Sequence, residues 1–81
     1  MNDEQVEQAC RCAQEQAALD MPYVEVEEVR LYQYHGSSGR WYVEVDLQHS
    51  NPSEGAAIAL YRVWKRVDGS MAATKVDIRK A

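Results

Sequence analysis

A strict alternation of apolar and polar side chains runs through residues 41–48, and it constrains the fold more than any other feature. One side of the pattern is apolar and the other polar or charged: Trp41, Val43, Val45 and Leu47 against Tyr42, Glu44, Asp46 and Gln48. Successive side chains of a β-strand point to opposite faces, so this segment predicts a strand with one buried face. Such a strand needs pairing strands and a layer that covers its apolar side.

The preceding segment supplies one pairing strand. Residues 23–34 alternate in the same way, but the phase changes at Glu27 and Glu28, which predicts a β-bulge there. Gly-Ser-Ser-Gly at residues 36–39 predicts the connecting loop.

Matching the faces of the two strands predicts their register. We expect His35 opposite Trp41 on the inner side and Arg30 opposite Asp46 on the outer side. A slip by one residue would bring Trp41 against Tyr34.

The C-terminal part of the chain predicts a second hairpin. Residues 57–67 and 70–79 flank Asp68-Gly69, a dipeptide typical of tight hairpin turns, and we expect Val67 opposite Ser70. A helix over residues 54–67 stays open, because Pro52 and the capping residues around it also suit a helix start. Tyr61, Val63, Trp64 and Val67 favour the strand.

Residues 3–20 predict a helix, which Pro22 ends. Its apolar stripe is narrow and made mostly of small residues, namely Val6, Cys10, Ala13 and Ala17. Cys10 and Cys12 point about 200° apart on a helix, so we expect two free thiols.

The predicted fold is therefore a single α+β domain over residues 1–81, with one N-terminal helix packed on a four-stranded antiparallel meander. This element order, α-β-β-β-β, resembles the cystatin-like architecture, in which a long antiparallel sheet wraps one helix. The resemblance implies a strongly curved sheet. The inhibitory Gln-Val-Val-Ala-Gly-type loop of cystatins is absent, since residues 35–39 read His-Gly-Ser-Ser-Gly, and cysteine-protease inhibition is not implied.

The outer faces of the two hairpins differ in charge. The first carries the acidic face Glu25, Glu27, Glu44 and Asp46. The second combines apolar and basic side chains, and we expect an interface formed by Ile58, Leu60, Arg62, Trp64, Arg66 and Met71. Trp and Arg are enriched in the energetically dominant residues of protein interfaces.

Several function classes find little support. The net charge of −4 disfavours binding to phosphates. Residues 50–81 carry six basic and three acidic side chains, but residues 1–49 carry three basic and ten acidic side chains, which would repel a phosphate backbone. Direct nucleic-acid binding is therefore not expected.

We expect no catalytic residues, metal or cofactor, because no nucleophile, acid–base pair or ligand cluster is visible. The N-terminus lacks an apolar signal segment, and no run of about 20 apolar residues is present, so we expect a cytoplasmic protein.

The main hypothesis is a non-catalytic protein-protein interaction module. It would associate with a second copy as a homodimer, or act as a small inhibitor or adaptor of a larger protein, through the outer sheet face. By analogy of size and charge, the acidic face suggests a phage-type inhibitor of a host nucleic-acid-binding defence enzyme. A further alternative is a small-ligand-binding domain with a pocket between helix and sheet, lined by Trp41, Tyr61 and Gln33 beside the small Ala9, Ala13 and Ala17.

Overall fold

A computed structural model describes residues 3–49, 53 and 55–80. The helix α1 spans Asp3–Asp20, and four strands follow it: β1 Val24–His35, β2 Arg40–His49, β3 Ala56–Lys65 and β4 Met71–Lys80. The strands form one open antiparallel sheet in the order β1-β2-β3-β4. The predicted α+β meander is confirmed, and the alternative helix over residues 54–67 is not formed, since Ala56–Lys65 is a strand and residue 54 lies outside the described residues.

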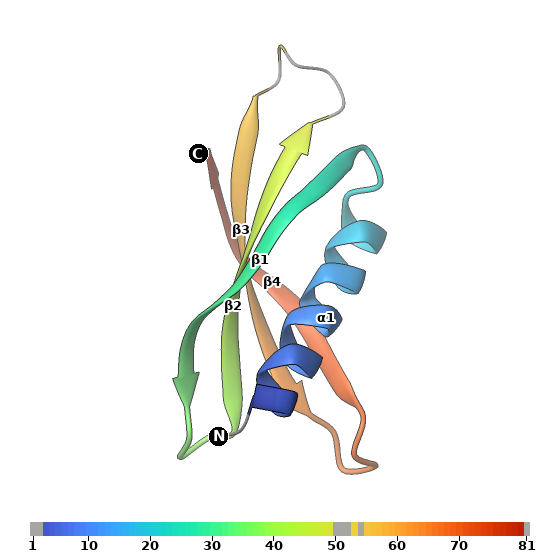
Figure 1. Cartoon of the computed structure of the whole chain (residues 1–81). Coiled ribbons are helices and arrows are strands. Elements are labelled where there is room, and N and C mark those ends of the chain that lie inside the picture. The colour runs from blue at the N-terminus through green and yellow to red at the C-terminus, as the bar shows by residue number, and fades with distance from the viewer. Residues whose placement is uncertain (1–2, 50–52, 54, 81) are drawn as a thin grey trace.

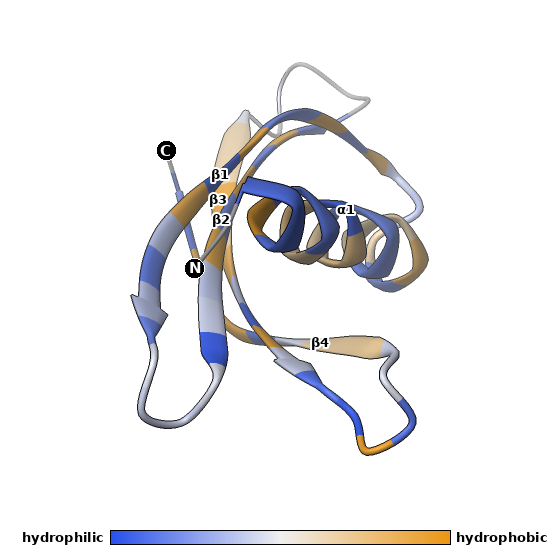
Figure 2. Cartoon of the chain, turned by 60° about the horizontal axis from the view of Figure 1, so that its bottom comes forward, coloured by the Kyte–Doolittle hydropathy of each residue, from blue (hydrophilic) through white to orange (hydrophobic). Residues whose placement is uncertain are grey.

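The sheet is strongly twisted and curls around the helix. Figure 1 shows α1 lying obliquely against one face, and Figure 2 shows it in the hollow of the curled sheet. We call the face that contacts α1 the inner face and the opposite face the outer face. Curling brings all four strands into contact with a single helix, which a flat sheet of this width would not allow.

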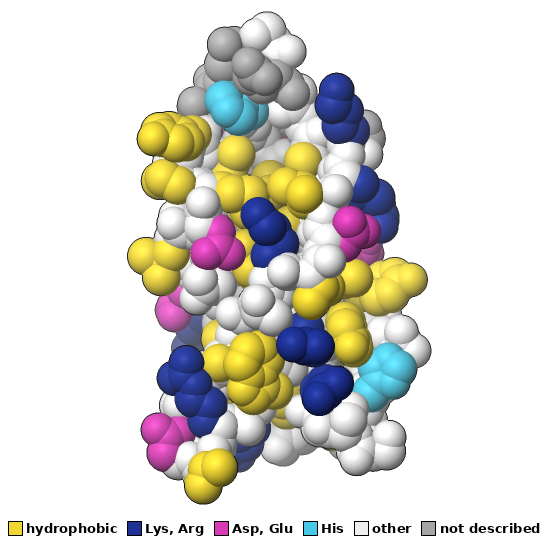
Figure 3. Space-filling model, turned by 180° about the vertical axis from the view of Figure 1, so that it is seen from behind, with side chains coloured by type: hydrophobic (Ala, Val, Ile, Leu, Met, Phe, Trp, Pro, Cys, Tyr) yellow, Lys and Arg dark blue, Asp and Glu magenta, His cyan; other side chains and the backbone are white. Residues whose placement is uncertain are grey.

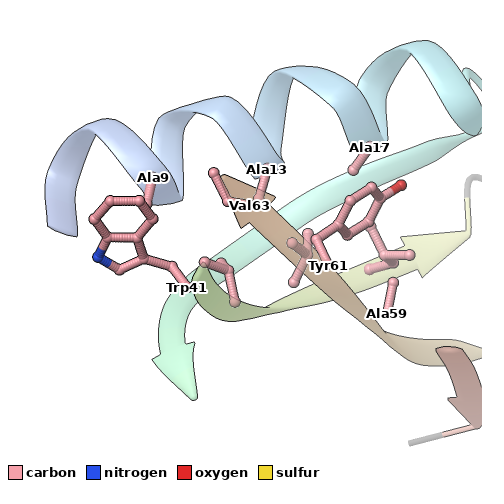
Figure 4. Packing of buried hydrophobic residues seen from close by; sticks show 10 residues of the cluster. Ala9, Ala13, Ala17, Trp41, Ala59, Tyr61 and Val63 are labelled. Carbon is pink, nitrogen blue, oxygen red and sulfur yellow. The ribbon is translucent and has the colours of Figure 1, made fainter. Parts of the chain in front are cut away.

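Small residues on α1 set the distance between helix and sheet. Ala9, Ala13 and Ala17 have no exposed surface, and they lie against large side chains of β2 and β3 (Figure 4). Because an alanine side chain is a single methyl group, the helix backbone comes close to the sheet, and Trp41 and Tyr61 fill the remaining space. The predicted stripe is therefore only partly right: Ala13 and Ala17 are in the core, but Ala9 takes its third buried position, whereas Cys10 and Val6 are half-buried.

The register of β1 on β2 differs from the predicted one. The expected bulge is confirmed between Val26 and Glu28. A second irregularity, between Leu31 and Gln33, was not predicted. The hairpin closes with His35 opposite Arg40, so Tyr34 lies opposite Trp41. The second irregularity shifts the pairing by one further residue, so Arg30 lies opposite Glu44. The predicted pairings of His35 with Trp41 and of Arg30 with Asp46 are therefore wrong.

The β3–β4 turn is one residue longer than predicted. The Arg66 amide donates to the Ser70 carbonyl oxygen at 2.7 Å, and the Gly69 amide donates to the Arg66 carbonyl oxygen at 3.0 Å. Three residues therefore connect the strands, with Gly69 at a φ of 92°, which suits a glycine in this type of loop. The predicted pairing of Val67 with Ser70 is wrong.

This longer turn moves Met71 to the other face. Met71 pairs with Lys65 and Ala73 with the buried Val63, so both lie on the inner face, where they pack against the core. The predicted outward position of Met71 is therefore wrong. An irregularity beside Leu60 restores the predicted pairing of Ala59 with Ile78 farther along.

The helix covers only part of the inner face. Its 18 residues span about 27 Å, whereas the 12 residues of β1 span about 40 Å. A turn that pairs Val67 with Ser70 would place Val76 and Ile78 in the core. In the structure they are 44% and 46% exposed, because they lie toward the end of the sheet that α1 does not reach. This end of the inner face is consequently open.

Candidate functional site

The outer face carries a cluster of arginines and aromatic rings on its two central strands. Arg40 pairs with Trp64, and the neighbouring Tyr42 pairs with Arg62, so the four side chains form a compact block across β2 and β3. We call Arg40, Tyr42, Arg62 and Trp64 the outer patch. It lies in the lower half of the face drawn in Figure 3, where basic and hydrophobic side chains alternate.

Ring contacts hold the aromatic members of the patch in place. The Arg62 guanidinium lies over the Trp64 ring, 5.7 Å from its centroid. Tyr42 meets the ring of His35 edge-on, with the centroids 5.2 Å apart. Trp64 is half-buried, and its neighbour on β4 is the small Ala72, which is 6% exposed. The Trp64 ring is thus fixed on one side and accessible on the other.

The arginines of the outer face divide into two groups. Arg30 donates two hydrogen bonds to the Asp46 carboxylate, at 2.7 and 3.0 Å, and Arg79 donates one to Glu44 at 2.9 Å. Within the described residues, Arg40 and Arg62 have no acidic partner. The positive charge of the outer patch is therefore not neutralised by the part of the chain that the structure describes.

A carboxylate cluster occupies the centre of the same face. Glu44 is only 9% exposed and lies between Arg79 and Arg30, whose Nε is 3.5 Å from it. The hydrogen bond from Arg30 lowers the pKa of Asp46, and the same bond raises the pKa of Arg30. These groups are engaged with one another, whereas Arg40 and Arg62 of the outer patch form no ion pair with an acidic side chain of the described residues.

The predicted acidic face is divided by this arrangement. Glu44 and Asp46 lie together but take part in ion pairs with arginines of the same chain. Glu25 and Glu27 lie toward the start of β1, and Glu27 is the additional residue of the bulge. The four acids therefore do not form one unpaired anionic stripe.

Four of the six residues predicted to form an interface lie in one row on the outer face. Ile58, Leu60, Arg62 and Trp64 follow one another along the outer face of β3 and are all half-buried, whereas Arg66 is exposed at the turn. Met71 lies on the inner face, as described above. The prediction missed Arg40 and Tyr42, although the alternation in residues 41–48 had already placed Tyr42 outward.

The predicted ligand pocket is filled by its own lining residues. Ala9, Ala13 and Ala17 are fully buried, Tyr61 has no exposed surface, and Trp41 is 3% exposed. Gln33 pairs with Tyr42 on the outer face and is exposed, far from this space. The space expected between helix and sheet is filled because the small helix residues let the helix pack closer to the sheet.

The chemistry of the described residues is limited. Residues 3–49, 53 and 55–80 contain no group of three or more His, Cys, Asp or Glu side chains placed to hold a metal ion. Cys10 and Cys12 are free and half-buried, and burial raises the pKa of both thiols. In this same part of the chain no helix combines the length and apolar character needed to cross a membrane.

Comparison with known proteins adds no relative: no family model, no curated protein and no solved structure matches this chain.

Proposed function

We propose that this chain is a non-catalytic protein-interaction module, a small adaptor or inhibitor that binds a larger protein through the outer patch and the adjacent Ile58 and Leu60. The observation that carries this proposal is the pair of arginines without acidic partners, Arg40 and Arg62, beside the half-exposed ring of Trp64. Such a combination of an aromatic anchor and arginines is characteristic of binding hot spots.

The geometry of the patch favours binding without rearrangement. The side chains stand on two central strands, which are held by hydrogen bonds on both sides. Arg62 is already stacked on Trp64, so little rotamer entropy remains to be lost on association. Ile58 and Leu60 extend the apolar surface along β3 toward the roughly 800 Å² per partner of a standard interface.

The charge of the patch indicates the character of the partner. Two unpaired guanidinium groups beside an aromatic ring complement a surface with carboxylates around an apolar pocket. Because Glu44 and Asp46 are paired within the chain, they offer a second copy less charge with which to meet this patch, which favours a different protein as the partner. The same pairing weakens the proposal that the acidic face imitates phosphates.

The test compares two aromatic substitutions. Trp64→Ala removes the anchor of the patch, whereas Tyr32→Ala removes an exposed ring on the edge strand β1. With the chain immobilised and an extract of the cells that encode it, we expect Trp64→Ala to weaken capture of the partner by about 30-fold or more. Tyr32→Ala should capture normally, and circular dichroism should show both variants folded.

Salt dependence gives a second readout. Arg40→Ala and Arg62→Ala should slow association and reduce its sensitivity to ionic strength, because each removes a long-range attraction to an acidic partner. Equal capture by the wild type and Trp64→Ala would show that the outer patch is not the interface.

A further inference from the structure

An apolar groove of about 460 Å³ lies at the end of the inner face that α1 does not cover. Its apolar lining comes from β1, β2, β3 and β4 together with the segment that follows the helix: Met21, Tyr23, Val24, Leu47, Ala57 and Ile78. Figure 3 shows hydrophobic side chains gathered in a hollow in the upper half of the view, with basic side chains beside them. The groove is separate from the outer patch.

The groove exists because of where the helix ends. Asp20 is the last residue of α1, and Pro22 prevents its continuation over the rest of the sheet. The strands continue, and the small Ala57 leaves space above Leu47, which is 1% exposed. Ile78 keeps 46% of its surface exposed at the rim. This volume lies within the range of roughly 300–1,000 Å³ typical of small-molecule sites.

Some of the charged side chains around the groove already have hydrogen-bond or ion-pair partners. The Asp20 carboxylate accepts hydrogen bonds from the Tyr61 hydroxyl at 2.7 Å and from Gln16 at 2.8 Å, and Lys75 lies near enough to lower its pKa further. Arg79 also lines the groove, but its guanidinium is bound to Glu44. The acid and one of the cations at the rim are therefore already occupied.

Lys80 is different. It lines the groove, its side chain is exposed, and within the described residues that side chain forms no hydrogen bond or ion pair. Among the described residues that line the groove, the free charge at the rim is consequently positive, next to an apolar floor.

We propose that this groove binds a small amphipathic anion, an unbranched alkanoate-like molecule, with its apolar chain over Leu47, Ala57 and Ile78 and its carboxylate near Lys80. The apolar floor selects the chain by burial, and Lys80 selects the sign of the head group. The proposal does not depend on the outer patch, so either site can fail without the other.

The test is a titration of the full chain with n-alkanoates of six to twelve carbons, below their micellar concentrations, followed by calorimetry. Each added methylene should tighten binding by about fourfold until the groove is filled. At matched length the alkanol should bind about two- to fivefold more weakly than the alkanoate, and the alkyl trimethylammonium more weakly still.

Three variants and one control variant locate the site. Ile78→Glu places a charge at the apolar rim, and Ala57→Leu fills the groove without adding charge, so both should abolish alkanoate binding. Lys80→Ala should lower alkanoate affinity about two- to fivefold and leave the alkanol unchanged, whereas Lys65→Ala, at the far end of β3, should change neither.

Light scattering on the same samples tests the competing occupant. If the wild type is a dimer that Ile78→Glu dissociates, and no alkanoate binds, a second copy covers the groove and the proposal is wrong. Absence of binding to the folded monomer also overturns it, as does equal affinity for all three head groups.

Discussion

Substituting Tyr61→Phe tests how the end of the helix is fastened to the sheet. The Tyr61 ring is fully buried, and its hydroxyl donates a 2.7 Å hydrogen bond to the Asp20 carboxylate, 41 residues away in the sequence. The substitution keeps the ring and removes only the hydroxyl. A hydrogen bond to a charged group contributes about 1.5–3 kcal/mol, and we expect about 1.5 kcal/mol because the exposed Asp20 regains water.

Thermal unfolding at neutral pH measures this loss. For a chain of 81 residues, a decrease of about 1.5 kcal/mol corresponds to a decrease in Tm of about 6–12 °C. Tyr32→Phe is the matched control, since Tyr32 is 58% exposed and should change the free energy of unfolding by less than about 0.5 kcal/mol.

The pH dependence supplies an independent check. The hydrogen bond from Tyr61 lowers the pKa of Asp20, whereas burial and the bond to Asp20 raise the pKa of Tyr61. A carboxylate with a lowered pKa stabilises the fold above the pKa of the unfolded chain, about 3.9, and this contribution is lost as the pH falls. The difference between wild type and Tyr61→Phe should be full at pH 7 and should shrink below about pH 4. Equal Tm values at pH 7, or a difference that is unchanged at pH 2.5, would refute the reasoning.

Two further predictions concern the helix. Ala13→Leu should lower the free energy of unfolding by about 1–3 kcal/mol in urea titrations, because the fully buried Ala13 leaves no space against the sheet, whereas Ala18→Leu on the exposed side should change it by less than about 0.5 kcal/mol; equal effects would contradict the close packing. Cys10 and Cys12 should react with iodoacetamide at neutral pH more slowly in the folded chain than in urea, because burial raises the pKa of both thiols, and mass spectrometry should find no disulfide between them; equal rates in the two states would argue against this burial.

The elements of the fold could be predicted because their patterns are local. Alternation marked residues 41–48 as a strand with one buried face, and the phase change at Glu27 and Glu28 marked the bulge. Strand propensity at Tyr61, Val63 and Trp64 outweighed the capping signal near Pro52.

The register could not be predicted, because it depends on irregularities without a clear local signal. The second irregularity of β1, near Tyr32, does not interrupt the alternation in a way that the sequence reveals. The Asp68-Gly69 dipeptide suits both a two-residue and a three-residue turn, and the difference of one residue moved Met71 to the inner face.

In the candidate sites, too, some features follow from the local sequence pattern and others depend on contacts between distant residues. The outward positions of Ile58, Leu60, Arg62 and Trp64 follow from alternation alone. The neutralisation of Glu44 depends on Arg79, which is 35 residues away, and the groove depends on where α1 stops relative to β4. Such long-range relations require the assembled sheet.

Photo-crosslinking from the outer face shows directly whether the outer patch contacts a larger protein. Benzoylphenylalanine in place of Leu60, on the outer face of β3, is compared with the same group in place of Tyr32 on β1, after irradiation in an extract of the encoding cells. We predict adducts from position 60 whose mass exceeds twice the 9.2 kDa of one chain. These adducts should be lost with Trp64→Ala, and position 32 should not give them. Adducts of two copies alone, or heavier adducts from position 32 but not from position 60, would contradict the proposal that the outer patch binds a larger protein.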